Sequence, residues 1–237
     1  MQLDRYLSKY AGLSRKSILR LLHLGQIQVD NAVTQSRTHE VNDFSQIHIQ
    51  GELLSLHKPA RYFMMNKPAG ILSATKDSQH TTAIELISEE NRTDLHIAGR
   101  LDRATTGLLI LTNDGKWSRQ LTEPLQKIPK VYLVETAHAI SPQTPEIFQQ
   151  GIYFKYENIT TSPAEIEIIK PTTCRLTIYE GRYHQVKRMF SAVGNRVIRL
   201  HRESMGDIVL DENLAYGEYR ALNKNEINSI TRTALKK

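Results

Sequence analysis

One acidic residue, Asp102, stands between two arginines in a segment that can hold a reactive carboxylate. Residues 99–115 (GRLDRATTGLLILTNDG) place Arg100 and Arg103 beside it, in a short polar loop before the apolar run 108–111. A buried strand fixes the backbone of such a loop, and neighbouring guanidinium groups favour the ionised carboxylate. An ionised, positioned aspartate can act as a nucleophile or a general base. The same spacing also occurs in surface turns with solvated arginines, so the loop alone leaves both interpretations open.

Three further segments carry candidate chemistry, although each is ordinary by itself. Residues 62–72 (YFMMNKPAGIL) predict an apolar strand that ends near Lys67, which alone is most simply a surface lysine at a strand end. Tyr132, in residues 130–135 (KVYLVE), lies on one face of a predicted strand, where a tyrosine is normally a core residue. Residues 180–190 (EGRYHQVKRMF) predict a strand-to-helix turn, typical of a helix start that binds phosphate. The polar side chains of this turn are Arg182, His184, Gln185, Lys187 and Arg188.

The distribution of charge indicates an extended anionic partner. The formal net charge is +6 and the isoelectric point is about 9.3, which suggests an anionic partner without identifying it. Residues 181–202 hold six basic residues, the last of them Arg202, and no acidic one. Residues 1–25 hold five basic residues against Asp4 alone. Two separated basic segments favour a polyanion over a small anionic metabolite.

The amino-terminal part of the chain predicts two helices and a small sheet. Residues 3–10 predict the first helix, and Ser14 is suited to cap a second helix that ends before Gly25. Beyond it, apolar and polar residues alternate, with a turn at residues 30–31 and a later strand around residues 47–49. The two helices can present their basic residues together on one surface: Arg5, Lys9, Arg15, Lys16 and Arg20.

A second domain is expected to begin near Tyr62, after a junction at residues 51–61 that contains Pro59. Helices are predicted over residues 82–89 and 185–193. Strands are predicted over residues 62–65, 97, 108–112, 131–136, 164–169 and 175–179. The sequence therefore predicts a mixed α+β fold with a largely antiparallel sheet. A short helix and a frayed basic tail are expected over residues 223–237.

Composition and motif content argue against several other classes of protein. Hydrophobic residues make up 40% of the chain and charged residues 24%, as is ordinary for a globular protein. We find no apolar run of membrane-spanning length and no secretory signal, so we expect a cytoplasmic protein with no membrane partner. Cys174 lies in a strand-like alternation typical of a buried thiol. Neither metal-ligand spacing nor a Walker-type glycine loop occurs, so we expect no metal and no cofactor. The lack of heptads favours a monomer.

Two resemblances to known families follow from these motifs. Residues 3–31 (LDRYLSKYAGLSRKSILRLLHLGQIQVDN) resemble the S4-like RNA-binding domain in the leading LD, the SR before the second helix and the G-x-I-x-V entry to the hairpin. Over nearly the whole chain, NKPAG, GRLDRATTGLLILTNDG, the K-x-Y of Lys130 and Tyr132, and EGRYHQVKRMF occur in the order and spacing of the pseudouridine synthases. HRESMGDI and LAYGEYRAL look like the branch that modifies the small ribosomal subunit. The resemblance implies an S4-like RNA-binding domain over residues 1–57 and a pseudouridine synthase catalytic domain over residues 61–235.

The resemblance also implies the reaction and the roles of the site residues. A uridine in 16S ribosomal RNA, reached in a small-subunit assembly intermediate, is isomerised to pseudouridine after it is flipped out of the RNA. Asp102 is the catalytic nucleophile, Lys187 keeps it ionised where many relatives have arginine, and Tyr132 stacks on the target base. Arg100 is expected either to fill the space that the flipped nucleotide vacates or to hold the flipped state through phosphate contacts. Further RNA contacts are expected from Arg103, Arg182, His184, Gln185 and Arg188 in the catalytic domain, and from Arg5, Arg15, Lys16 and Arg20 in the amino-terminal domain.

Three alternatives remain at this point. A non-catalytic RNA-binding ribosome assembly factor would share the fold but places no demand on a paired carboxylate and a base-stacking tyrosine. A pseudouridine synthase that acts on large-subunit RNA would share the chemistry. A metabolite-binding α+β enzyme would not account for the basic residues of the amino-terminal helices or for those of residues 181–202.

Overall fold

The structure is a computed structural model that describes residues 1–42, 44–54, 59–92 and 94–235. The chain forms two compact units, residues 1–60 and 61–237. The expected junction lies partly outside the described residues, and the end of the expected basic tail, residues 236–237, also lies outside them. None of the helices in the described ranges combines the length and the apolar character that crossing a bilayer requires.

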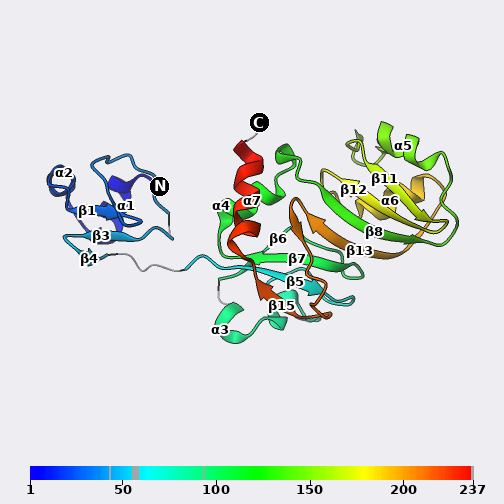
Figure 1. The fold of residues 1–237 in the computed structure, drawn as a ribbon, viewed down its shortest axis with the longest axis horizontal. Helices are drawn as coiled ribbons and strands as arrows, with labels where there is room; N and C mark the ends of the chain where they lie inside the picture. The colour runs from blue at the N-terminus through cyan, green and yellow to red at the C-terminus, as the bar shows by residue number, and fades with distance from the viewer. Residues whose placement is uncertain (43, 55–58, 93, 236–237) are drawn as a thin grey trace. The chain divides into compact units, whose positions relative to one another are not determined.

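The amino-terminal unit consists of two helices and a four-stranded antiparallel sheet in the order β2-β1-β3-β4 (Figure 1). Its elements are α1 (Leu3–Ala11), α2 (Arg15–His23), β1 (Ile27–Val29), β2 (Ala32–Val33), β3 (Ile47–Ile49) and β4 (Glu52–Leu53). Apolar residues of both helices and of β1 and β3 form its core, together with one loop residue: Leu3, Tyr6, Leu7, Ile18, Leu22, Ile27, Val29, Val41 and Ile47. The basic face of the helices is therefore left to solvent.

Local sequence signals set the ends of these elements. The Ser14 side chain accepts a hydrogen bond from the backbone N–H of Ser17 at 3.2 Å and so caps α2. Gly25 follows the end of this helix with a left-handed φ of 65°. Asp30 and Asn31, with φ values of 50° and 68°, make the tight turn between β1 and β2. The helices, turn and strands predicted for this unit are confirmed.

The second unit is built on one nine-stranded sheet. Its main path runs β11-β12-β8-β13-β7-β5-β15, with β14 paired to β13 and β6 to β7. Among the described residues, β13 pairs with β7 in parallel and the other neighbours are antiparallel, so the predicted α+β class with a largely antiparallel sheet is confirmed. The strands are β5 (Tyr62–Lys67), β6 (His96–Ala98), β7 (Thr106–Thr112), β8 (Lys130–Thr136), β11 (Glu165–Lys170), β12 (Thr173–Ile178), β13 (Val197–Met205), β14 (Ile208–Val209) and β15 (Tyr219–Ala221), and a separate hairpin joins β9 (Tyr153–Phe154) to β10 (Ile159–Thr160).

Helices cover both faces of this sheet and bury β7 almost completely. They are η1 (Ala83–Leu86), α3 (Glu89–Arg92), α4 (Gly115–Thr122), η2 (Pro124–Gln126), α5 (Thr144–Gln150), α6 (Gln185–Ala192) and α7 (Lys224–Leu235). Figure 1 shows α4 and α7 side by side, and the indole N–H of Trp117 donates to the Ile227 carbonyl at 3.0 Å. On β7, Leu108 and Ile110 pack in the core with α4 and α7, whereas the alternate residues of the strand pack in the core with α6. Burial on both faces explains the unbroken apolar run.

Two helix predictions need correction. Residues 82–89 do not form one helix, because η1 ends before Ile87, which is extended and 2% exposed. Burial of Ile87 in the core therefore overrides the local helix preference. At the carboxyl end, the expected short helix is the twelve-residue α7, whose Ile230 is buried against the sheet. The helix predicted over 185–193 is confirmed as α6, and the six predicted strands match observed strands to within two residues at each end.

Gly107 allows the parallel strands β7 and β13 to approach closely. It pairs with Arg202 across the two strands and has a φ of +100°. A Cβ atom at this position would overlap the Arg202 carbonyl oxygen and lie 2.7 Å from the Arg202 nitrogen. Only glycine fits this backbone without displacing the neighbouring strand.

We expect Gly107→Ala to lower the free energy of unfolding by about 2–4 kcal/mol, because it adds both backbone strain and overlap with β13. The measurement is urea unfolding followed by circular dichroism. Gly115→Ala is the matched control, because Gly115 opens α4 with open space around its Cβ position and alanine favours helix. Equal stability of the two variants would contradict the close approach.

Candidate active site

A cleft of about 740 Å³ opens beside Asp102 in the second unit. Its walls come from the loop before β7, from β8 and from the turn that begins α6, so the separate sequence segments meet here. Asp102, Tyr132 and Lys187 all line it. The structure thus brings together the three residues predicted to be catalytic.

Asp102 contacts two basic side chains: His184, in the turn before α6, and Lys187, within α6. Its Oδ2 lies 3.4 Å from Lys187 Nζ, and its Oδ1 lies 3.6 Å from His184 Nε2. The Asp102 side chain is 28% exposed, so the carboxylate keeps access to the cleft while it is paired. The carboxylate therefore has a lysine and a histidine beside it and can still be reached from the cleft, as attack on a bound ligand requires.

The backbone on the amino-terminal side of Asp102 is held by the buried guanidinium of Arg202, on β13. Arg202 is 1% exposed, and it donates from Nη2 to the Gly99 carbonyl at 2.7 Å and from Nη1 to the Arg100 carbonyl at 3.4 Å. Its Nε donates to the Leu108 carbonyl at 2.9 Å, on the neighbouring strand. Arg202, counted in the sequence among the cations facing a polyanion, is therefore a positioning residue inside the protein, and that interpretation was wrong.

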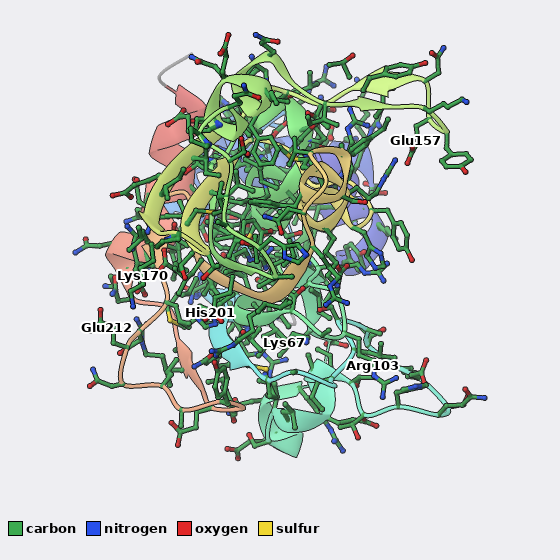
Figure 2. The ribbon with its side chains drawn as sticks, turned by 90° about the vertical axis from the view of Figure 1, so that its right-hand side faces the viewer. Lys67, Arg103, Glu157, Lys170, His201 and Glu212 are labelled. Carbon is green, nitrogen blue, oxygen red and sulfur yellow. The ribbon has the colours of Figure 1, made fainter. Side chains whose placement is uncertain are left out.

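The backbone on the other side of Asp102 is held by Lys67, at the end of β5. Its Nζ donates to the carbonyls of Arg103 at 3.2 Å, Thr105 at 2.9 Å and Pro68 at 2.9 Å. Lys67 is fully buried, so the expectation of a surface lysine was wrong. Figure 2 shows Lys67 within the unit, in contrast to the outlying Glu157. Burial lowers the pKa of Lys67 to about 8, against the opposing influence of the Asp102 carboxylate, while the Arg202 charge lowers it further.

Tyr132 forms part of the cleft wall and is also tied to Arg202. It lies on β8, is 7% exposed and packs within the apolar core on the α6 side of the sheet. Arg202 Nη1 lies 3.5 Å from the Tyr132 hydroxyl oxygen. One buried arginine therefore contacts both the loop that carries Asp102 and the ring that is expected to stack on a base.

A hydrogen-bonded cluster around Glu180 shapes the turn that carries His184 and Lys187. Glu180, 7% exposed, accepts hydrogen bonds from the Gln185 amide at 2.9 Å, from Arg182 Nε at 3.0 Å and from the Ser162 backbone N–H at 2.9 Å. The Gln185 oxygen accepts from the backbone N–H of Arg182 at 3.0 Å. His184 then takes a left-handed φ of 50° directly before α6. This fixed turn aims His184 and Lys187 at Asp102.

The predicted RNA contacts of this unit divide into two groups. Arg100, Arg103 and Arg182 line the cleft and are exposed, which leaves them accessible to a ligand. Gln185 is 3% exposed and its amide is used within the protein, so the structure places it as a support of the turn instead of a surface contact. Arg188 donates from both Nη atoms to Glu157 at 2.6 Å and lies over the Phe154 ring.

The basic residues predicted to bind RNA in the amino-terminal unit all lie on its surface. Arg5, Arg15, Lys16 and Arg20 are exposed on α1 and α2. The apolar residues of the same helices are buried in the core of the unit instead. These cations are available to a polyanion.

Sequence reasoning missed the supporting residues Lys67, Arg202, Glu180 and Lys130. Lys130, 6% exposed on β8, donates to the Ile128 carbonyl at 3.0 Å, and burial lowers its pKa to about 8. One signal was available for Arg202, because strand alternation puts it on the same face as buried Leu200. Among the described residues, no group of three or more His, Cys, Asp or Glu side chains is arranged to hold a metal ion.

Comparisons with known proteins identify relatives of this chain. The sequence profile of the RNA pseudouridylate synthase family matches residues 61–192. A Pseudomonas aeruginosa protein named ribosomal small subunit pseudouridine synthase A is 50% identical over 97% of this chain and 100% of its own length. The Escherichia coli K12 protein of the same name is 42% identical over 97% of this chain and 100% of its own length. A crystal structure described as a pseudouridylate synthase is 37% identical, covers 97% of this chain and 99% of that chain, and superposes with a TM-score of 0.71.

The chain therefore belongs to the RNA pseudouridylate synthase family, and it is an isomerase of that class. Its relatives place it in the branch named for ribosomal small subunit pseudouridine synthase A. The resemblance to the pseudouridine synthases inferred from the motifs is confirmed.

We expect Lys67 to titrate with a midpoint near pH 8, well below the ordinary lysine value of 10.5, because burial disfavours its charged form. Between these two values the unfolded chain binds a proton that the folded chain has released. The contribution of this group to the free energy of unfolding therefore rises with pH between about 8 and 10.5. Below pH 8 the lysine is charged in both states, and the protein bears the whole cost of burying that charge. NMR titration of protein labelled with ¹³C at lysine Cε measures the midpoint.

Two variants assign the resonances of this titration. Lys67→Met removes one of the two early-titrating signals, and Lys130→Met removes the other, since burial lowers the pKa of Lys130 to about 8 as well. One folded variant is enough to assign both signals, because the signal that disappears belongs to the substituted lysine and the signal that remains belongs to the other. Titration of all lysine signals at the ordinary surface value would contradict the buried ammonium at Lys67.

Proposed function

We propose that this protein converts one uridine of 16S ribosomal RNA into pseudouridine, with Asp102 as the nucleophile. The observation that carries the proposal is the accessible Asp102 carboxylate, paired with Lys187 and His184 beside Tyr132 in one cleft. The names of relatives 42–50% identical over nearly the whole chain support a small-subunit target. The carboxylate supplies the chemistry, and the relatives suggest where it is used.

The reaction rearranges bonds within one nucleotide and needs no co-reactant. An oxygen of Asp102 attacks ribose C1′ as the bond from C1′ to uracil N1 breaks, and the electron pair leaves with the uracil. The detached base turns in the cleft, C5 bonds to C1′ and Asp102 is released. The proton on C5 leaves, and N1 receives one. Atoms and electrons balance, because the product is an isomer of the substrate.

Three side chains of the cleft assist this sequence. Lys187 stays near the Asp102 carboxylate and balances its negative charge before attack. As a point charge, it leaves the second carboxylate oxygen to His184. Tyr132 offers a rigid ring in the cleft wall, on which the free uracil can stack while it turns.

The cations at the mouth of the cleft suit a flipped nucleotide. Extrusion of a base costs a few kcal/mol, which contacts to the RNA backbone can offset. Arg100 and Arg103 are exposed at this cleft and can bind the flanking phosphates. Arg182 is also exposed there, but its Nε is paired with Glu180, so only its Nη atoms are available for a weaker contact with the RNA. Arg100 also follows Gly99 directly into the Asp102 loop, so we assign it the role of holding the flipped state.

The amino-terminal unit, which resembles an S4-like module, is proposed to dock the enzyme on structured RNA through its exposed cations. The amino-terminal unit would then supply RNA affinity, and the catalytic domain that follows it would carry out the reaction. We further propose that the substrate is a small-subunit assembly intermediate, in which the target uridine is still accessible, and that the enzyme acts in the cytoplasm as a monomer.

We expect Asp102→Asn to abolish pseudouridine formation while RNA affinity stays within a few-fold of the original, since the amide keeps the shape but cannot attack C1′. The measurement is tritium release from 5-tritiated uridine in small-subunit RNA, with binding followed separately by filter retention. Asp207→Asn is the matched control, because Asp207 is an exposed aspartate between β13 and β14, away from the cleft. Unimpaired turnover by Asp102→Asn would remove this mechanism.

We expect Arg15→Gln combined with Lys16→Gln to weaken RNA binding and to reduce the salt dependence of log K by about 0.9 for each phosphate that is no longer neutralised. Turnover at saturating RNA should stay the same, because the substituted residues lie outside the catalytic unit. Adding Arg5→Gln and Arg20→Gln should deepen the loss. Lys170→Gln with Lys224→Gln removes the same charge from exposed positions of the other unit. Equal binding by the two double variants would contradict the docking role.

A further inference from the structure

A second, shallower groove of about 350 Å³ adjoins the Asp102 cleft. It is lined by Pro124, Glu157, Glu180, Gly181, Arg182 and Tyr183. Pro124, Gly181, Arg182 and Tyr183 also line the Asp102 cleft. The two spaces are therefore neighbours, and a polymer bound at Asp102 can reach the second groove.

Tyr183 stands where the two spaces meet and presents an aromatic face to solvent. The residue is 75% exposed, although tyrosine rings are usually buried in part. One face of its ring is stacked on His184, with a centroid distance of 3.9 Å and an interplanar angle of 17°. His184 in turn contacts Asp102. Contacts thus run from the Asp102 carboxylate to the His184 ring and from that ring to Tyr183, whose other face is open.

The groove is nearly balanced in charge, which decides what it can bind. Glu157 is paired with Arg188 through two 2.6 Å hydrogen bonds, and the Glu180 carboxylate accepts from Arg182 and Gln185. The two carboxylates of the groove are thereby neutralised by two guanidinium groups. Such a surface attracts a phosphate less than the cations at Arg100 and Arg103 do, and it suits a flat, uncharged group.

The walls of the groove are held in place before any ligand arrives. The Arg188 guanidinium lies 3.7 Å from the centre of the Phe154 ring, so the β9–β10 hairpin is tied to α6 by both stacking and charge. Figure 2 shows Glu157 on the outlying hairpin that forms this wall. The Glu180 cluster fixes the turn on the opposite side. A preformed aromatic face lowers the entropic cost of stacking.

We propose that Tyr183 is a stacking site for the base of the nucleotide next to the flipped uridine. This inference rests on the proposed function, because it takes RNA as the ligand of the adjoining cleft. The neighbouring base loses its stacking partner when the uridine leaves the helix, and the ring of Tyr183 replaces that partner. The site is indifferent to base identity, since every base has a stacking face.

The test compares kcat/KM of the full-length enzyme and its variants on an RNA fragment that contains the mapped target uridine. Tyr183→Ala should lower kcat/KM by about 5- to 150-fold, the range that loss of one stacked base produces, and Tyr183→Phe should retain it. Tyr216→Ala is the matched control, because Tyr216 is 56% exposed and lines neither space.

RNAs that lack the base on one or the other side of the uridine locate the contact. At one of the two positions, the abasic RNA should lower kcat/KM of the wild type, and Tyr183→Ala should then cause no further loss. A uniform loss on intact RNA and on both abasic RNAs, or no loss at all, would overturn the proposal.

A fluorescence measurement separates this inference from the proposed function. With 2-aminopurine at the identified neighbouring position, or at each position in turn, the wild type should quench the fluorescence and Tyr183→Ala should not. Absence of pseudouridine formation by the wild type on every RNA would contradict the proposed function, whereas equal quenching by both proteins would contradict the stacking site.

Discussion

Two buried cations hold the backbone on either side of Asp102, and the active site depends on them. Arg202 binds the carbonyls of Gly99 and Arg100, and Lys67 binds those of Arg103 and Thr105. Buried charges are costly unless their hydrogen bonds are satisfied, and here backbone carbonyls supply most of the acceptors. The loop thus receives its shape from interactions within the protein, before any substrate binds. Asp102 is left free of a structural role and partly open to the cleft.

Arg202 also connects the strands around the site. Arg202 lies on β13 and reaches both Leu108 on β7 and the Tyr132 hydroxyl on β8, so it spans three neighbouring strands. Gly107 allows this, because its missing side chain lets β7 run against the Arg202 backbone. On the far side of the cleft, the Glu180 cluster sets the turn that carries Lys187. Arg202 therefore supports both the Asp102 loop and Tyr132, and the Glu180 cluster supports Lys187, the proposed counter-charge.

Much of the fold could be predicted from the sequence because it rests on local signals. Ser14, Gly25 and the turn at residues 30–31 act through caps and backbone conformation that neighbouring residues determine. The Asp102, Tyr132 and Lys187 set followed from ordered motifs. By contrast, the burial of Lys67 and Arg202 depends on partners 36 and 94 residues away in the chain. The sequence around Lys67 gives no local sign of burial, and for Arg202 the available sign is the strand alternation that puts it on the same face as Leu200. The helix expected over residues 82–89 is prevented by a similar long-range effect, the burial of Ile87.

Mapping of pseudouridines in 16S ribosomal RNA from cells with and without this protein tests the proposed reaction and its target together. One modified position should disappear without the protein and return when the unaltered gene is supplied. An unchanged set of modifications in 16S ribosomal RNA would contradict the proposed target, and it would do so even more clearly if a position in large-subunit RNA disappeared instead.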